Sequence, residues 1–293
     1  MTGVIFAIIT SVFFALYIAP RKLSKLPAIQ FNTLMAFGFT VGSSLLYFIQ
    51  VILGNNEGLF VKGILYALLA GLFWTIAIMS LVKSIDLIGL ARSNQWKNLQ
   101  GPIGVLLSLF FLGEAASVNP WLALTSGIAI FSAAAAFNIQ NSKDVKSINR
   151  SGVMLALLAG LAFGIHSMVA KWLTDNVGVY NQLVYMSATI LVLLLIVQIY
   201  QGELSKEMIK IKREVVLGIG SGLLYVGASA FMLLSFQRLE ASIAFTIIQL
   251  NFIGVVGLGI FVFKEIDVKG NEKRLLTGSL LALLGVVLLA YSR

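Results

Sequence analysis

A polar segment lies where the sequence otherwise predicts a hydrophobic, membrane-spanning stretch. From Ala91 to Gly104 the chain reads ARSNQWKNLQGPIG and then continues into the apolar run VLLSLFFLG. The polar side chains within it are Arg92, Asn94, Gln95, Lys97, Asn98 and Gln100. A charge at the centre of a bilayer costs about 2.5–3.5 kcal/mol on insertion scales. We therefore expect Lys97 to face a water-filled cavity or a polar partner rather than lipid.

These residue types are suited to binding a ligand that is rich in hydroxyl groups. Asn94, Lys97 and Asn98 recur at three- and four-residue spacing and so share one face of a helix. The amides of Asn94 and Asn98 both donate and accept hydrogen bonds. Trp96 adds a flat apolar surface on which the C–H face of a sugar ring could stack. Pro102 cannot donate to the carbonyl of Asn98, so we expect a kink that leaves this carbonyl open to a cavity.

The same segment has a structural explanation, in which it begins at the membrane surface. In that case the side chains from Arg92 to Gln95 are simply hydrated. The explanation is weaker for Lys97, Asn98 and Gln100, because polar groups deeper in a span are usually functional.

The elements that must position this segment are membrane-spanning helices. Of the 293 residues, 59% are hydrophobic and 11% are charged, whereas a soluble domain carries about 25% charged residues. The period-two alternation of a membrane barrel is not seen, so the sequence predicts an all-α polytopic membrane protein. Its apolar runs predict ten transmembrane helices near 2–19, 30–53, 61–82, 93–112, 121–139, 151–170, 180–200, 215–236, 242–263 and 274–291.

The basic residues predict the orientation of these spans. Sixteen of the 21 Lys and Arg residues fall on the side shared by the odd-numbered connections, four fall on the other side, and Lys97 lies within a span. Because basic loops stay in the cytoplasm, we expect a plasma-membrane protein with both termini on the extracytoplasmic side. The same rule accounts for the net charge of +9 without nucleic acid as a partner.

The second half of the chain repeats the first. GVIFA at Gly3 aligns with GVMLA at Gly152, and after a two-residue shift Glu114 aligns with Glu265. Residues 1–142 and 150–293 thus form two five-helix repeats, joined by a cytoplasmic linker at 143–149. An odd number of spans inverts the second copy, and inverted repeats are a signature of secondary transporters.

The repeat also relates amides in the fourth and ninth spans. Asn98 pairs with Gln249 and Gln100 with Asn251, so these four side chains should face one another near the pseudo-two-fold axis. The substrate-binding residues that the sequence predicts are Asn94, Trp96, Lys97, Asn98, Gln100, Gln249 and Asn251.

One further motif indicates a family. FFALYIAPRKLSK at Phe13–Lys25 is similar to the Tyr-x-Ala-Pro-x-Lys-Lys ending of the first helix in rhamnose-type porters, the branch that includes bacterial glucose and ribose uptake proteins. The two inverted five-helix repeats resemble the drug/metabolite transporter superfamily. This resemblance implies a secondary active permease that imports a monosaccharide by alternating access, in some members with proton symport.

The candidates for proton coupling are few, since no carboxylate lies clearly at mid-bilayer. His166 in the sixth span could carry a proton, because histidine has an unperturbed pKa of about 6.5, but it could equally be a helix-packing partner. Glu114 and Glu265 end the fourth and ninth spans, where they could couple a proton at a gate or act as caps and loop salt bridges.

Sugar import has two alternatives. An exporter or exchanger of amino acids, drugs or anionic metabolites would use Lys97 and Arg92 to bind a carboxylate or phosphate. An enzyme is not expected, because no catalytic motif is present. Because the chain has no Cys and a single His, we expect no metal site and no cofactor. The expected partners are a small-molecule substrate and the lipid bilayer, and the oligomeric state is left open.

Overall fold

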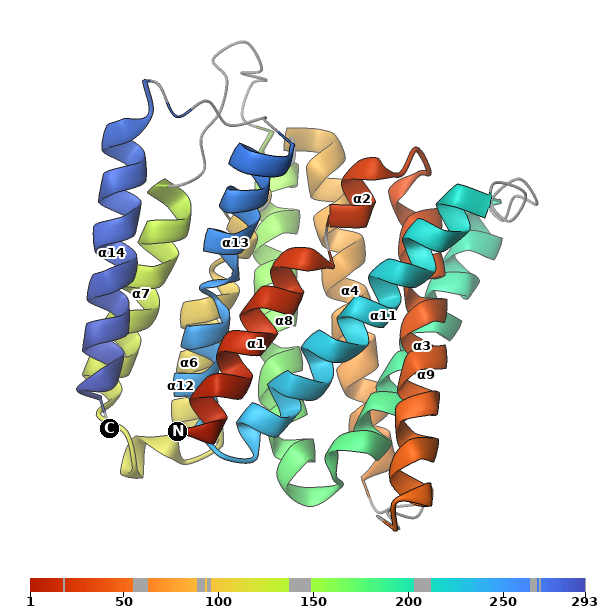
Figure 1. Ribbon diagram of the computed structural model, residues 1–293, viewed down its shortest axis with the longest axis horizontal. Helices are drawn as coiled ribbons and strands as arrows, with labels where there is room; N and C mark the ends of the chain where they lie inside the picture. The colour runs from red at the N-terminus through yellow and green to blue at the C-terminus, as the bar shows by residue number, and fades with distance from the viewer. Residues whose placement is uncertain are drawn as a thin grey trace. The chain divides into compact units, whose positions relative to one another are not determined.

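The computed structural model describes the whole chain except residues 18, 55–62, 89–92, 94–95, 137–148, 203–211, 264–267, 269 and 293. Within these described parts the ordered elements are all helices (Figure 1). They are α1 (Thr2–Leu16), α2 (Ala19–Leu23), α3 (Ala28–Ile52), α4 (Ile64–Ile88), α6 (Gln100–Phe111), η1 (Glu114–Ala116), α7 (Pro120–Ala136), α8 (Arg150–Asn176), α9 (Val179–Gln201), α11 (Lys212–Phe236), α12 (Ala241–Ile248), α13 (Asn251–Gly257), η3 (Leu258–Val262) and α14 (Glu272–Ala290).

Most of these helices are long and apolar enough to cross a membrane. Among the described residues, eight stretches meet that requirement by length and composition. They are Thr2–Leu23, Ala28–Ile52, Ile64–Ile85, Arg150–Asn176, Val179–Gln201, Lys212–Phe236, Ala241–Val262 and Glu272–Ala290. Two shorter apolar helices, α6 and α7, occupy the positions of the predicted fourth and fifth spans. The all-helical polytopic architecture is confirmed, while the count of ten spans stays a prediction.

The first predicted span is divided into two helices. The chain ends α1 after Leu16 and begins α2 at Ala19. Pro20 has no N–H to donate to the carbonyl of Leu16, so an unbroken helix would lose a hydrogen bond at this point. The family-like motif of Phe13–Lys25 therefore spans the end of one helix and a separate helical turn.

The chain forms two compact units, of which the first contains residues Met1–Thr75 and Val169–Arg238. In this unit α11 packs against α1 and α3, and α3 packs against α9. Gly222 permits the close approach of α11 to α3, because a Cβ atom there would overlap the backbone of Met35 and Phe39. Trp74 Nε1 donates to the hydroxyl of Tyr225 at 2.6 Å in the buried interior.

The second unit contains Ile76–Met168 and Leu239–Arg293. Here α7 lies beside α14, and α6 lies beside α7 and α12 (Figure 1). Ser126 Oγ of α7 donates to the carbonyl of Gly285 in α14 at 2.6 Å. A small apolar core of Ile130, Ala133, Phe252 and Ala282 joins α7, α13 and α14.

Each unit draws on both halves of the sequence. The packing units are thus distinct from the repeats predicted at 1–142 and 150–293, which are defined by sequence similarity and chain order. Most of the predicted linker, 143–148, lies outside the described residues. Gly71 and Gly222, which are 151 residues apart, occupy similar settings in the first unit. A Cβ at Gly71 would lie 2.9 Å from the carbonyl oxygen of Met186 in α9.

Candidate functional site

The fourth predicted span is interrupted at the polar segment. Leu99 N–H donates to Trp96 O at 3.2 Å and Gly101 N–H to Asn98 O at 3.1 Å, which are the three-residue steps of a tight turn. The helix α6 begins only at Gln100, whereas the sequence predicted a span starting at 93. Pro102 is the third residue of α6. The expectation of an open Asn98 carbonyl is wrong, because the turn gives this oxygen the N–H of Gly101.

The ninth predicted span is interrupted in the same way. Leu250 N–H donates to Ile247 O at 3.0 Å and Phe252 N–H to Gln249 O at 3.4 Å. These two bonds lie 151 residues after the two bonds of the first turn, and α13 begins at Asn251. The position that corresponds to Pro102 is Ile253. A proline is therefore not the common cause of the two interruptions.

The two interruptions meet within the second unit. Gln100 Nε2 donates to Gln249 Oε1 at 3.3 Å, and each of these side chains is 8% exposed. Gly101 makes this approach possible, since a Cβ there would lie 3.2 Å from Gln249 Cγ. One turn further along α6, Gly104 lies against the ring of Phe245. The two glycines let α6 and α12 come together where the polar side chains gather.

A pocket opens at this junction. Its empty volume is about 260 Å³, but most of this is open space at its mouth, and the enclosed part has room for about one water molecule. Its lining combines amides, a hydroxyl and apolar groups, namely Asn98, Gly101, Pro102, Gly127, Ile130, Phe131, Ala134, Thr246 and Gln249. Two of the predicted binding residues, Asn98 and Gln249, thus line one pocket.

Lys97 lies next to this pocket and contacts Asn98. Its Nζ is 3.4 Å from Asn98 Oδ1 and 5.6 Å from the centroid of the Phe163 ring, a cation–π arrangement. An ammonium group only donates hydrogen bonds, so the Asn98 oxygen faces Lys97. The amide nitrogen of Asn98 is then the group left for a ligand. Within the described parts of the chain, no carboxylate forms an ion pair with Lys97.

The other predicted binding residues have different surroundings. Trp96 is 37% exposed and is not part of the pocket lining. Asn251 Nδ2 donates to the carbonyl of Ile248 at 2.9 Å, within its own turn. Asn94 and Glu265 lie outside the described residues.

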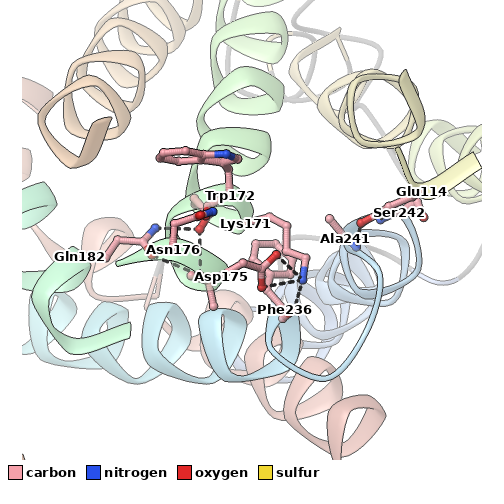
Figure 2. A network of polar contacts seen from close by, with 11 residues as sticks. Glu114, Lys171, Trp172, Asp175, Asn176, Gln182, Phe236, Ala241 and Ser242 are labelled. Carbon is pink, nitrogen blue, oxygen red and sulfur yellow. Dashed lines mark hydrogen bonds and ion pairs between the residues drawn. The ribbon is translucent and has the colours of Figure 1, made fainter. Parts of the chain in front are cut away.

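Two of the three candidates for proton coupling, His166 and Glu114, are buried. His166 lies in α8 and is 3% exposed. Glu114 is 7% exposed, and its Oε1 accepts from Ala241 N–H at 2.5 Å while its Oε2 accepts from Ser242 N–H at 2.9 Å (Figure 2). These are the first two residues of α12, so Glu114 caps this helix. This is the structural alternative that the sequence offered for Glu114.

A second helix end is capped by a cation. Lys171 Nζ donates to the carbonyl of Phe236, the last residue of α11, and lies 3.0 Å from the carboxylate of Asp175 (Figure 2). A positive charge is favourable at this end of a helix, where carbonyl groups lack partners within the helix.

Sequence reasoning did not select Thr246 and Phe131 of the pocket lining. The position of Thr246 was a usable signal, because it precedes Gln249 by three residues and so shares its face of the helix. Phe131 had no such signal, since it comes from α7 and reaches the pocket only through tertiary packing. Among the described residues, no three His, Asp or Glu side chains gather as a metal site would require.

The comparisons with known proteins agree with this architecture. The family described as "Sugar transport protein" matches residues 36–292, which is most of the chain. A solved structure titled "Crystal structure of protein" is similar over 100% of this chain and 97% of that chain, with a TM-score of 0.73 and 14% sequence identity. At that identity the likeness shows a shared fold alone. No curated protein matches the sequence. By its family match this chain is a multi-pass membrane protein that belongs to the sugar transport protein family.

Proposed function

We propose that this protein is a secondary active transporter that imports a monosaccharide across the plasma membrane by alternating access. The observation that carries the proposal is the junction of two interrupted helices at a pocket lined by Asn98, Thr246 and Gln249. Interrupted helices that meet near the midplane are the usual way in which transporters build a substrate site. The family match supports a sugar as the substrate class.

The proposal includes ten spans in two inverted repeats, as in the drug/metabolite transporter superfamily. Three observations support it, and each relates residues 151 positions apart. The two interruptions have matching hydrogen bonds, and Gly71 and Gly222 have similar close contacts. Trp74 and Tyr225, which are also 151 apart, contact each other directly, as residues beside a two-fold axis do.

The chemistry of the pocket suits a monosaccharide. Amides and a hydroxyl serve the sugar hydroxyls, while Ile130 and Phe131 give apolar surface for the C–H groups of the ring. Gln100 lies behind Gln249 and holds its amide oxygen. Since the enclosed part of the pocket is too small for a monosaccharide, the proposal requires the pocket to widen when the sugar enters. Roles for Asn94, Trp96 and Asn251 at a wider stage of the cycle remain part of the proposal.

Proton symport is the coupling that we propose to test. His166 is the best of the three candidates, because it is buried in a predicted span and histidine is a common proton carrier in transporters. Both carboxylate oxygens of Glu114 accept hydrogen bonds from the backbone of α12, which favours a structural role for this residue. Glu265 stays a candidate on its sequence position alone.

An exporter or exchanger of anionic metabolites is the second candidate function. The favouring observation is that Lys97 contacts an amide and an aromatic ring and has no carboxylate partner in the described chain. A substrate carboxylate or phosphate could take that place.

Transport by the purified protein in liposomes tests the proposal. We expect uptake of at least one of radiolabelled D-glucose, D-ribose and L-rhamnose, and stimulation by an inward proton gradient if protons are coupled. Radiolabelled amino acids and phosphorylated sugars are measured in the same vesicles. Uptake of the charged compounds without uptake of the sugars would contradict sugar import and support the second candidate function.

A further inference from the structure

We propose that Glu114 is a positioning residue for the pocket, which it controls through helix α12 without touching the ligand. This inference rests on the proposed sugar transport, because it concerns the same pocket. Glu114 is absent from the pocket lining, yet it binds the beginning of the helix whose other end carries Thr246 and leads into Gln249.

The contact of Glu114 with α12 is strong and buried. Both carboxylate oxygens accept backbone N–H groups, at 2.5 Å and 2.9 Å (Figure 2), and the side chain is 7% exposed. The first N–H groups of a helix lack partners within the helix and attract negative charge. The residue that precedes α12, Glu240, makes no capping hydrogen bond with its side chain. Glu114 therefore supplies from a distant part of the chain what α12 lacks locally.

Glu114 and the pocket amides fix α12 to α6 at both ends. The helix α6 begins at Gln100, which holds Gln249, and Glu114 follows its end and holds Ala241. The two helices therefore run antiparallel. Between these two points, Gly104 lies against Phe245. The eight residues of α12 span about 12 Å. Glu114 is bonded to the beginning of this helix and therefore limits how far α12 can slide along α6.

A short helix moves as a rigid body, and a shift at its beginning moves Thr246 and Gln249 by a similar amount. Ligand sites tolerate little displacement, because their hydrogen bonds weaken steeply with distance and angle. The remaining walls of the pocket belong to α6 and α7. Phe131 belongs to α7 and not to α12, so its contribution to binding should not depend on the position that Glu114 gives to α12.

The test compares how variants combine. Glu114→Gln, Thr246→Ala and Phe131→Leu are made singly, and Glu114→Gln is combined with each of the other two. KM and maximal uptake are measured for whichever of D-glucose, D-ribose and L-rhamnose the parent protein transports. We expect Glu114→Gln alone to raise KM about tenfold and to keep maximal uptake within about twofold of the parent. If two substitutions act independently, the factors by which they change KM multiply in the double variant.

The two combinations should differ. In the Thr246→Ala background we expect Glu114→Gln to raise KM by less than about threefold, and in the Phe131→Leu background by the full tenfold, since only residues that share a displaced element couple. Equal factors in both backgrounds would overturn the inference. The parent protein would still transport sugar in that case, so the failure would not be confused with failure of the proposed function.

Lys171→Met is the matched control for the loss of a buried helix cap. It removes the contact to Phe236 at the end of α11, five residues before Ala241 at the beginning of α12. The loss of stability should be similar in the two variants, about 1 kcal/mol. We expect KM to stay within about twofold of the parent, because the pocket lining contains no residue of α11. A rise in KM equal to that of Glu114→Gln would mean general destabilisation and would sink the proposal. If Glu114→Gln does not fold, Glu114→Asp replaces it, because the shorter carboxylate keeps the charge and draws α12 along α6.

Discussion

At the scale of single residues, the amides derive their roles from their neighbours. Lys97 can only donate, so it orients Asn98, and Gln100 donates to Gln249 in the same manner. Both pairs leave amide nitrogens for a ligand. The pocket therefore presents N–H donors, with the Thr246 hydroxyl, which donates to Ser242 O at 2.7 Å, left as an acceptor.

Removing either pocket amide should stop transport. For Asn98→Ala and for Gln249→Ala we expect sugar uptake to fall to background, because each change removes hydrogen bonds that a buried sugar hydroxyl needs. Membrane insertion should be unchanged, as measured by the amount of protein in isolated membranes. Parental uptake rates in both variants would show that the site lies elsewhere.

The charge of Lys97 distinguishes the two candidate functions. In Lys97→Gln, an amide still donates to Asn98, so we expect sugar uptake to fall by less than about tenfold, equivalent to about 1.4 kcal/mol. An anion transporter would instead lose its substrate binding, because the positive charge is gone. Uptake of D-glucose and of glucose 6-phosphate by the same vesicles separates the two outcomes.

At the scale of elements, glycines set which helices come into close contact. Gly222 and Gly220 both lie in α11, but a Cβ at Gly222 would overlap the backbone of α3, whereas a Cβ at Gly220 has open space around it. Backbone cannot move aside as a side chain can. The interface between α3 and α11 thus requires one glycine and not the other.

This difference gives a matched pair of variants. We expect Gly222→Ala to lower the thermal unfolding temperature, with a loss of stability of about 1–3 kcal/mol from overpacking. Gly220→Ala should be neutral or stabilising by up to about 1 kcal/mol, because alanine is the better helix former. Unfolding of the detergent-solubilised variants measures both effects. A destabilised Gly220→Ala together with a stable Gly222→Ala would contradict the packing of α11 described above.

At the scale of the whole molecule, the distribution of charge predicts the orientation in the membrane. The chain contains no Cys, so single cysteines can be introduced without a modified background. Thr2 and Lys25 are both exposed and lie at opposite ends of the first predicted span.

Labelling of these two positions tests the orientation. We expect a membrane-impermeant maleimide to label Thr2→Cys in intact cells and to label Lys25→Cys only after the membrane is opened. This pattern follows from retention of basic loops in the cytoplasm. The reverse pattern would place the termini in the cytoplasm and contradict the predicted orientation.

The sequence by itself determined that this is a helical membrane protein, and it predicted a polar, repeated element in the fourth and ninth of ten expected spans. Composition and hydrophobic run length decide membrane insertion locally, so tertiary contacts are not needed to recognise it. The pairing of Asn98 with Gln249 came from the alignment of the repeats, and both residues line the pocket.

Only the tertiary structure decided how these elements are joined. The tight turns at Asn98 and Gln249 differ from the single proline kink expected at Pro102, because similar turns form in both segments and only the first is followed by a proline. The approach of Phe131 from α7, and the cap that Glu114 gives to Ala241 and Ser242 across 127 residues of chain or more, depend on which helices pack together. Spacing along a sequence encodes contacts within one helix, whereas contacts between helices arise when the complementary shapes and unsatisfied backbone groups of distant segments meet.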